Sequence, residues 1–187
     1  MQAFLFYCIK IYRFSSHWNF AQNCAKISFR LVGDFLLHIV LVEPEIPQNT
    51  GNIARTCAAI GARLHIVRPI PFEVSDKAAR RAGLDYWAHL DLEMHENLSA
   101  FLEKYANAAL FFIETGTDTL YTDVTFPQDS FLLFGSETKG LSQALLASGL
   151  GQTLTIPMRA HIRSLNVSNA VAAVALELVR QRGLDGL

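Results

Sequence analysis

The chain has 187 residues, of which 51% are hydrophobic, so it suits a single domain with a sizeable core. No uncharged apolar run approaches the roughly 20 residues that span a membrane, so we expect no membrane partner. The formal net charge is −1, and the excess of basic residues is confined to the first 35 positions. The acidic remainder excludes a protein that coats nucleic acid with its whole surface, and RNA binding would need a local cationic patch.

The spacing of the cysteines and histidines indicates the redox state of the compartment and whether a metal site is expected. The three cysteines, Cys8, Cys24 and Cys57, are far apart and form no CxxC pair, which favours a reducing, cytoplasmic compartment. The six histidines show neither HxH nor HxxxH spacing. We therefore expect no metal site, and a structural or surface role for each histidine.

Residues 1–35 differ from the rest of the chain. Aromatic residues are interleaved with basic ones without a steady period, and the acid-poor composition resembles a transit peptide. The start also resembles a signal peptide, but Lys10 interrupts its short apolar stretch and no small-residue cleavage site follows. We expect a poorly ordered extension, or one that results from a start codon placed too far upstream, followed by one domain over residues 36–187.

Apolar strands that alternate with helices begin at Leu37. The run Leu37–Val42 is rich in β-branched residues and is ended by Pro44, so it predicts a buried strand. The next segments predict a turn over Asn49–Asn52 leading into a helix that ends at Gly61, a strand over Leu64–Val67 and a short helix from Ser75 to Arg81.

The second half continues this alternation. It predicts a helix over Asn97–Tyr105, strands over Ala109–Ile113 and Phe131–Phe134, a short helix over Gly140–Ala147, a strand over Thr153–Ile156 and a long helix over Ser164–Arg182. Strands that alternate with helices predict an α/β fold, with a parallel sheet covered by helices on both faces. Binding sites in such sheets lie beyond the carboxyl ends of the strands.

The first of three polar clusters at strand ends is Asn49-Thr50-Gly51-Asn52-Ile53-Ala54-Arg55. A glycine turn opens the predicted helix, and Arg55 lies one turn inside it. A capped helix with a surface arginine explains this cluster nearly as well as a functional site does.

The second cluster is Phe134-Gly135-Ser136-Glu137-Thr138-Lys139-Gly140-Leu141. A P-loop needs Lys directly after the second glycine, where this chain has Leu141, and no GxGxxG follows any strand. Nucleotide triphosphate hydrolysis and dinucleotide binding are therefore disfavoured. A tight loop whose backbone groups approach a planar ligand fits better, because an ordinary turn leaves the triplet Glu137–Lys139 unexplained.

The third cluster is Ile156-Pro157-Met158, followed by Arg163-Ser164-Leu165-Asn166-Val167-Ser168-Asn169-Ala170. Ser164 is a good N-cap for the last helix, but Asn166, Ser168 and Asn169 are poor interior helix formers. Local propensity often yields at functional sites, so these polar residues indicate a site as well as a helix start.

In this order the three clusters resemble the SPOUT superfamily, and more narrowly its SpoU-type branch of 2′-O-ribose methyltransferases. The combination of NxGNxxR, FGSExxGL and IPM…RSLNVSNAVA is specific, and the resemblance extends from Leu36 to Arg182 with no room for a further RNA-binding domain. This minimal form, with the segment Arg80–Trp87, looks like the tRNA methyltransferases that act on the ribose of the wobble nucleotide, a cytidine or a modified uridine.

The resemblance implies a fold and a cofactor. It implies the SPOUT fold, in which the C-terminal part of the parallel sheet forms a deep trefoil knot that binds S-adenosylmethionine. Backbone groups of Ile113, Gly135 and Ile156 would hold the adenine and ribose of this cofactor, and Ser164 and Leu165 would line its methionine end.

The resemblance also assigns catalytic and RNA-binding roles. Arg55 would be catalytic, with Asn49, Glu137 and Asn166 orienting both Arg55 and the sugar. The family's arginine is often cast as the base, but a guanidinium stays protonated in proteins, so we expect Arg55 to stabilise the developing alkoxide or to clamp the adjoining phosphate. The local RNA patch would be Arg80, Arg81, Lys139, Arg159 and Arg163, each of which would equally suit a solvated surface.

Two macromolecular partners follow from the resemblance, the anticodon region of tRNA and a second copy of the chain. The helix Ala170–Val179 is apolar nearly all round, broken only by Glu177, and such a helix is buried on more than one side, as in a homodimer. Leu176 departs from the family, whose members often carry Tyr at this position.

Two other functions remain open. A ribosomal RNA methyltransferase of the same branch is disfavoured because the chain has no accessory RNA-binding domain. A non-catalytic RNA-binding knot protein is disfavoured because Arg55, Glu137, Ser164 and Asn166 are all present.

Overall fold

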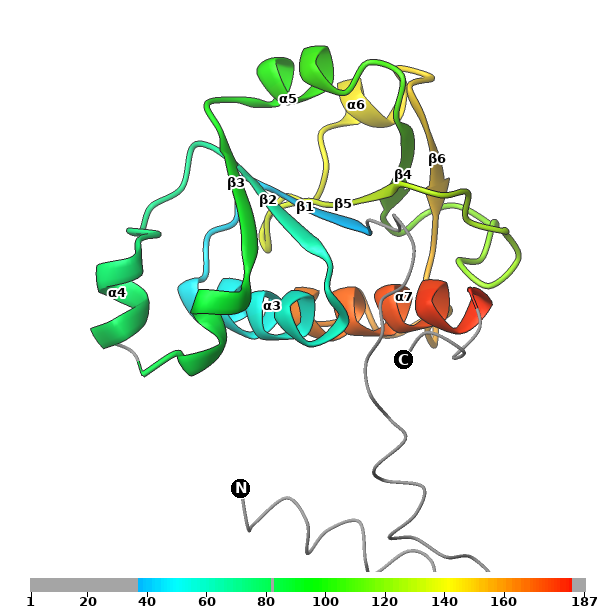
Figure 1. Cartoon of the computed structure of the whole chain (residues 1–187). Coiled ribbons are helices and arrows are strands. Elements are labelled where there is room, and N and C mark those ends of the chain that lie inside the picture. The colour runs from blue at the N-terminus through cyan, green and yellow to red at the C-terminus, as the bar shows by residue number, and fades with distance from the viewer. Residues whose placement is uncertain (1–36, 82, 183–187) are drawn as a thin grey trace, which may run out of the picture. The chain divides into compact units, whose positions relative to one another are not determined.

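The computed structural model describes residues 37–81 and 83–182, apart from the side chains at positions 76, 78 and 80. These residues form a six-stranded sheet in the order β3-β2-β1-β5-β4-β6 (Figure 1). Each neighbouring pair of strands in this sheet is parallel, which confirms the predicted α/β fold. The extension expected over residues 1–35 lies outside the described residues.

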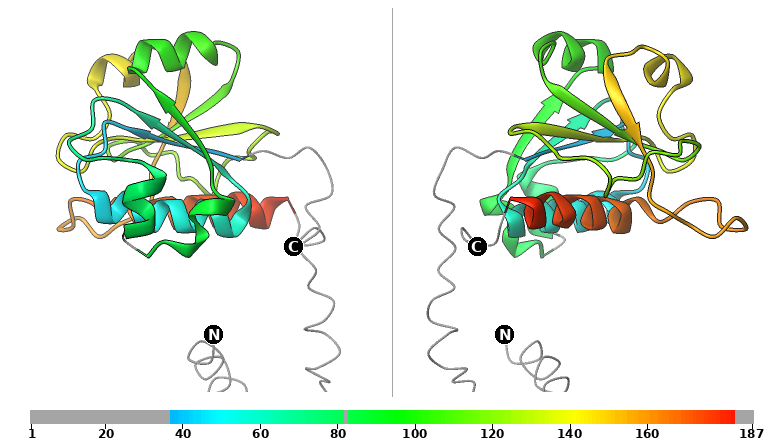
Figure 2. Two further views of the ribbon diagram at one scale, coloured as in Figure 1. Left: turned by 60° about the vertical axis from the view of Figure 1, so that its left-hand side comes forward. Right: turned by 90° about the vertical axis from the view of Figure 1, so that its right-hand side faces the viewer.

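Helices cover both faces of the sheet. α3 and α7 lie on one face, and α5 and α6 on the other (Figure 1 and Figure 2). Within the described ranges, each helix is too short or too polar to cross a membrane. The strands are β1 (His38–Val42), β2 (Arg63–Val67), β3 (Asp91–His95), β4 (Ala109–Ile113), β5 (Ser130–Phe134) and β6 (Gly151–Leu154). The helices are α3 (Pro47–Ile60), α4 (Asp76–Arg81), the 3₁₀-helix η1 (Asp85–His89), α5 (Leu98–Lys104), α6 (Gln143–Leu146) and α7 (Val167–Gln181).

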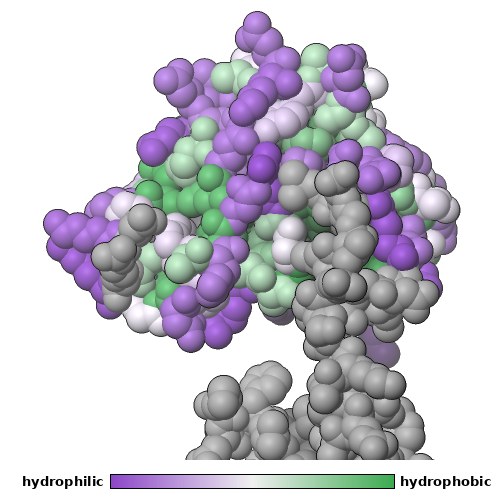
Figure 3. Space-filling view, viewed as in Figure 1, coloured by the Kyte–Doolittle hydropathy of each residue, from purple (hydrophilic) through white to green (hydrophobic). Residues whose placement is uncertain are grey.

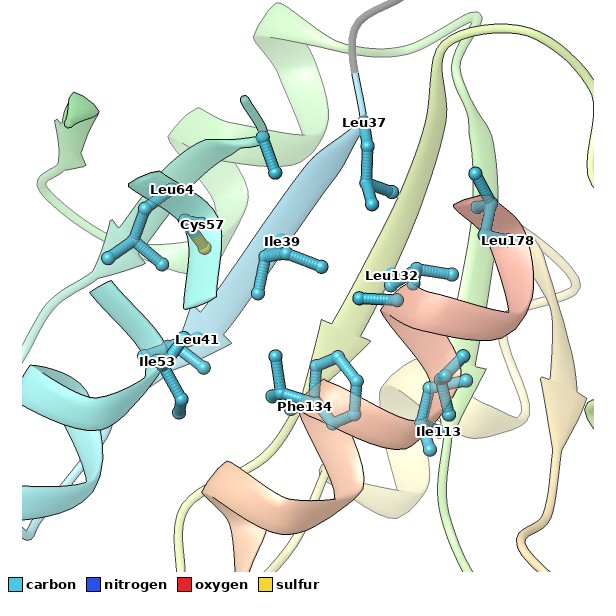
Figure 4. Packing of buried hydrophobic residues seen from close by; sticks show 14 of the residues in the cluster. Leu37, Ile39, Leu41, Ile53, Cys57, Leu64, Ile113, Leu132, Phe134 and Leu178 are labelled. Carbon is cyan, nitrogen blue, oxygen red and sulfur yellow. The ribbon is translucent and has the colours of Figure 1, made fainter. Parts of the chain in front are cut away.

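Alternate residues of β1 belong to two separate cores, because successive side chains of a strand point to opposite faces. Ile39 and Leu41 pack on the side of α3 and α7, as Figure 4 shows. Val40 and Val42 pack on the other side with Phe101 of α5. Every residue of β1 is buried, which explains why this central strand has a continuous apolar sequence.

The strand order reverses beside β1. From β1 the chain builds outward through β2 and β3 on one side, and later forms β4, β5 and β6 on the other. Ligands of open parallel sheets bind at such a reversal, beyond the carboxyl ends of the strands. The three polar clusters follow β1, β5 and β6, so the fold directs them to one edge of the sheet.

α3 begins before the turn that the sequence predicts. Pro47 occupies the first helical position, where its missing N–H is least costly, and residues 49–52 are helical. The predicted turn over Asn49–Asn52 is therefore wrong, and Arg55 lies more than two turns inside the helix rather than one. Gly61 ends α3 in the left-handed conformation, with φ 69°, as predicted.

The N-terminus of α7 also differs from the prediction. Asn166 caps this helix by accepting a hydrogen bond from the Ser168 backbone N–H at 2.9 Å, so the prediction that Ser164 is the N-cap is wrong. β6 ends at Leu154, two residues before the predicted end at Ile156. Both differences lengthen the irregular segment between β6 and α7, and this segment projects beyond the sheet in Figure 2.

Three histidines from neighbouring strands meet on the α5 face of the sheet. His38 Nδ1 lies 2.8 Å from His65 Nε2, and His65 Nδ1 lies 3.0 Å from His95 Nε2. Burial lowers the pKa of His38 to about 4, with the charge of Arg63 adding to the decrease. Burial also lowers the pKa of His65 to about 3. Both side chains are therefore neutral at pH 7.

We expect the protein to lose stability as the pH falls from 7 to 5. Histidine in the unfolded chain titrates near pH 6.5, whereas folded His38 and His65 have pKa values of about 4 and 3. The unfolded chain binds protons in this window and the folded chain does not, so each histidine removes about 2 kcal/mol from the free energy of unfolding. Urea unfolding across this pH range measures the slope. The double variant His38→Gln, His65→Gln should flatten it, and the exposed-site variant His161→Gln should not; equal slopes in all three proteins would contradict the assignment.

Candidate active site

A pocket of about 710 Å³ opens beyond the carboxyl ends of β1, β4, β5 and β6. This volume is typical of small-molecule and cofactor sites. The residues expected to hold the cofactor all line the pocket: Ile113, Gly135, Ile156, Ser164 and Leu165. Asn49, Glu137 and Asn166 of the expected catalytic set line it as well.

The loop after β5 folds back tightly on itself. A Cβ atom at Gly135 would lie 2.0 Å from the carbonyl carbon of Gly140, so no larger residue fits without a shift of the backbone. The Gly140 N–H donates to the Ser136 carbonyl at 2.9 Å and closes the loop. All of residues 134–140 line the pocket, and the two glycines in this loop contribute only backbone to that lining.

Glu114 is a pocket residue that the sequence analysis does not single out. Its Oε2 accepts a hydrogen bond from the Leu141 N–H at 2.9 Å, and its Oε1 accepts one from the Thr115 N–H at 3.0 Å. Glu114 thereby ties the segment after β4 to the loop after β5. Its place directly after the predicted strand Ala109–Ile113 is the signal that could have identified it.

The three polar clusters are joined through Asn49. Asn49 Nδ2 donates to Glu137 Oε1 at 2.9 Å, and Asn166 Nδ2 donates to Asn49 Oδ1 at 3.0 Å. Each cluster contributes one residue to this arrangement, which we call the Asn49 network (Asn49, Glu137 and Asn166). The structure thus brings together three of the four expected catalytic residues.

The carboxylate of Glu137 is held by several donors. The backbone N–H groups of Glu45 and Ile46 donate to it at 2.8 and 3.2 Å. Desolvation acts to raise the pKa of Glu137, but the hydrogen bonds from Asn49 and from these backbone groups outweigh it and hold the pKa below its usual value. Glu137 is therefore ionised at neutral pH and fixed in place, which suits an orienting group better than a general base.

Arg55 lies beside Tyr86 rather than with the Asn49 network. The central carbon of its guanidinium is 4.5 Å from the centroid of the Tyr86 ring. The Tyr86 hydroxyl in turn donates to the carbonyl of Gly51 at 2.7 Å. Arg55 is exposed on α3, and it is not among the residues that line the 710 Å³ pocket.

The expected RNA-binding residues form two groups. Lys139 and Arg163 line the 710 Å³ pocket, and Arg159 and Arg163 line an adjoining cavity of about 280 Å³. Arg81 is exposed on α4, a region covered by hydrophilic residues in Figure 3. The side chain of Arg80, also in α4, lies outside the described residues. Three of the expected cations therefore lie at the pocket and its adjoining cavity, in a domain that is otherwise acidic, whereas α4 lies outside both linings.

A group that could hold a metal ion lies on the α5 face, away from these clusters. His65, Glu93 and His95 each offer one ligand atom, and these atoms lie within 4.8 Å of one another. Sequence spacing does not reveal the group because its members come from two strands. Glu93 already accepts hydrogen bonds from Lys104 and Tyr105, at 2.7 and 2.9 Å. The absence of a metal stays a prediction.

The fold and the pocket together define a SpoU-type methyltransferase: a parallel α/β sheet whose strand ends join the three clusters around one cofactor-sized cavity. The SpoU rRNA Methylase family matches residues 36–176, and the chain belongs to this family. A tRNA (cytidine(34)-2′-O)-methyltransferase of Escherichia coli (strain K12) is 45% identical to it over 152 residues, which are 81% of this chain and 97% of that protein.

Solved structures agree with this assignment. One that concerns the 2-OH methylation of C/U34 on tRNA is 44% identical, has a TM-score of 0.74 and covers 80% of this chain and 98% of its own. A SpoU methyltransferase from Streptomyces viridochromogenes, in complex with the cofactor AdoMet, is 28% identical with a TM-score of 0.68 and covers 81% of this chain and 62% of its own. The resemblance inferred from the three clusters is confirmed.

Proposed function

We propose that this protein transfers a methyl group from S-adenosylmethionine to the ribose 2′-hydroxyl of the wobble nucleotide of tRNA, a cytidine or a modified uridine. The observation that carries the proposal is the 45% identity to the Escherichia coli tRNA (cytidine(34)-2′-O)-methyltransferase over 97% of its length. The pocket at the strand ends supports it, because its volume and mixed lining fit S-adenosylmethionine.

The residues that line the pocket can hold each part of this cofactor. When bound, S-adenosylmethionine would supply a methyl group carried on a positively charged sulfur. As the methyl group joins the ribose oxygen, its bond to sulfur would break to leave a neutral thioether, and the proton of the hydroxyl would pass to solvent water. Backbone groups of Ile113, Gly135 and Ile156 hold the adenine and ribose, and the close turn at Gly135 keeps this part of the lining free of a bulky side chain. Ser164 and Leu165 line the methionine end.

The Asn49 network orients the sugar. Its groups are already fixed by hydrogen bonds before RNA arrives, with Glu137 ionised and both asparagine amides engaged. Polar groups arranged in advance stabilise a transition state without the cost of reorganisation. Arg55 acts as a cation that stabilises the negative charge on the ribose oxygen or binds the adjoining phosphate, since its guanidinium stays protonated.

The basic residues near the pocket bind the anticodon region of the tRNA. Lys139, Arg159 and Arg163 surround the cavities, and Arg80 and Arg81 belong to α4. Contacts of this kind attach to phosphates and fix the position of the RNA without reading its bases. The three cations at the cavities support a local RNA-binding patch in a domain that is otherwise acidic.

We also propose that the C-terminal part of the domain, residues 36–187, forms the trefoil knot of the SPOUT fold. The segment after β6 runs along the connection between β4 and β5. Thr155 N–H donates to the Thr119 carbonyl at 2.9 Å, and Tyr121 N–H donates to the Thr155 carbonyl at 3.0 Å. A chain that threads through this connection would make such contacts. We assign the activity to the cytoplasm and expect residues 1–35 to be dispensable for it.

Mapping of 2′-O-methyl groups in a deletion strain tests the proposed function. The methyl group at the wobble position of some tRNAs should be absent, and the wild-type chain should restore it. Loss of a ribosomal RNA methyl group instead would favour the ribosomal alternative. Intact RNA methylation, together with no binding of S-adenosylmethionine in calorimetry, would favour a non-catalytic RNA-binding protein.

Methyl transfer in vitro should persist when a chelator is added, because we expect no metal to be needed. If the chelator abolishes activity and one divalent ion restores it, a metal is needed.

We expect the protein to form a homodimer through the outer face of α7. Val171, Val174 and Leu178 bury one face of this helix in the core, whereas Leu176 is 53% exposed. Sedimentation at micromolar concentration should show twice the mass of the 20.8 kDa chain. Leu176→Glu should shift the protein toward the monomer. Leu150→Glu, at a leucine that is 52% exposed before β6, is the matched control; a monomeric wild type would refute the dimer.

A further inference from the structure

Tyr86, from the segment Arg80–Trp87 that is part of the resemblance to tRNA methyltransferases, contacts Arg55. η1 packs against α3 and places Tyr86 along the helix surface. The hydroxyl of Tyr86 hydrogen-bonds to the Gly51 carbonyl, and the face of its ring lies against the Arg55 guanidinium. Residues 51 and 55 lie one helical turn apart on one face of α3, so one tyrosine contacts both.

We propose that Tyr86 is a positioning residue, which holds the guanidinium of Arg55 in the orientation that methyl transfer requires. This inference rests on the proposed function and on the role of Arg55 within it. Tyr86 acts through Arg55 and needs no contact with the cofactor or with the reacting oxygen.

Two contacts make Tyr86 suitable for this role. The negative face of an aromatic ring attracts a cation within about 6 Å of its centroid, and the observed 4.5 Å falls inside that range. The hydrogen bond to Gly51 fixes the outer end of the ring at 2.7 Å, so the ring is a rigid support. An exposed arginine would otherwise sample many rotamers, and the loss of this conformational entropy would raise the activation free energy of methyl transfer.

The simpler alternative is that Tyr86 only packs against the core. Its ring does contact the core on the α3 side, and its loss could therefore weaken the fold in general. The two interpretations differ in one respect. A positioning residue loses its effect when Arg55 is removed, whereas a packing residue keeps its effect on stability in any background.

A double-mutant cycle separates these interpretations. Tyr86→Leu should lower the single-turnover rate of methyl transfer about tenfold while the affinity for S-adenosylmethionine stays unchanged. Tyr86→Phe keeps the ring under the guanidinium but loses the hydrogen bond to Gly51, so its rate should fall by about threefold, clearly less than in the Leu variant. In an Arg55→Ala background, Tyr86→Leu should change the rate less than about twofold. Equal losses in the Phe and Leu variants, or an undiminished loss without Arg55, would overturn the proposal.

Leu92→Ala is the matched control, because Leu92 also packs partly buried against the α3-side core but comes from β3, at the end of the sheet. It should lower the thermal midpoint without slowing transfer tenfold. A second measurement does not depend on activity. Ring-current shielding should move the side-chain NMR signal of Arg55 upfield in the wild type and in Tyr86→Phe, and not in Tyr86→Leu. If the Arg55 signal of the wild type shows no shielding, Tyr86 does not position Arg55. If the wild type shows the shielding but methylates no wobble ribose, the proposed function is wrong, and with it this role for Tyr86.

Discussion

Arg55→Ala is expected to lower the single-turnover rate of methyl transfer by about 10²–10³ and to leave the affinity for S-adenosylmethionine nearly unchanged. Loss of one electrostatic partner of a transition state typically has an effect of this size. The affinity should persist because Arg55 lies beside Tyr86 on the outside of α3 and does not line the 710 Å³ pocket. Rapid-quench kinetics with excess enzyme and calorimetry with S-adenosylmethionine measure the two quantities separately.

Arg55→Lys is expected to be almost as inactive. A planar guanidinium can bind a phosphate and a sugar oxygen together, and the compact ammonium of lysine cannot reproduce that geometry. Lysine, however, loses its proton at lower pH than arginine and could act as a base. A rate of the Lys variant that recovers with rising pH would therefore favour the base role of Arg55 over the cation role.

Arg63→Ala serves as the control for both variants. Arg63 lies at the start of β2, at the sheet edge opposite the pocket, and pairs with Asp91 at 2.7 Å. Exposed ion pairs contribute little to stability, so this variant should transfer methyl groups at the wild-type rate. Near-normal rates in Arg55→Ala would remove Arg55 from the mechanism.

Most of the sheet could be predicted from the sequence because its signals are local. The buried strand at Leu37–Val42 and the left-handed end of α3 at Gly61 depend on a few adjacent residues. β3 could not be predicted in this way. It lies at the edge of the sheet, where Asp91 is exposed, the next three residues are partly buried and only His95 is buried. The parallel pairing with β2 supplies the stabilisation that its composition lacks.

The candidate site likewise has features that could be predicted from the sequence and features that could not. The three clusters predicted the lining of the pocket because each follows a strand whose carboxyl end faces the same edge. The partner of Arg55 could not be predicted, since Tyr86 reaches it only through the packing of η1 on α3. The grouping of His65, Glu93 and His95 likewise depends on the register between β2 and β3, which no spacing within a single strand reveals.

Gly135→Ala is expected to lower the affinity for S-adenosylmethionine by at least about 100-fold. A Cβ atom at this position would lie 2.0 Å from the Gly140 carbonyl carbon, 2.2 Å from the Leu141 nitrogen and 2.3 Å from the Gly140 oxygen. These are backbone atoms, so the loop from Gly135 to Leu141 must move as a whole. A displacement of about 1 Å in a site can lower the rate of catalysis about 100-fold, and we expect a loss of cofactor affinity of the same order here. Overpacking of this kind also lowers the free energy of unfolding by about 1–3 kcal/mol.

Calorimetry with S-adenosylmethionine and thermal unfolding of the same samples measure the two effects of Gly135→Ala. Gly51→Ala is the matched control, because a Cβ there would meet nothing closer than the Tyr86 hydroxyl at 3.9 Å. Alanine inside a helix is more stable than glycine by up to about 1 kcal/mol, so this control should bind the cofactor normally and unfold no earlier. A Gly135→Ala protein with wild-type affinity and an unchanged midpoint would show that the loop after β5 does not shape the cofactor site.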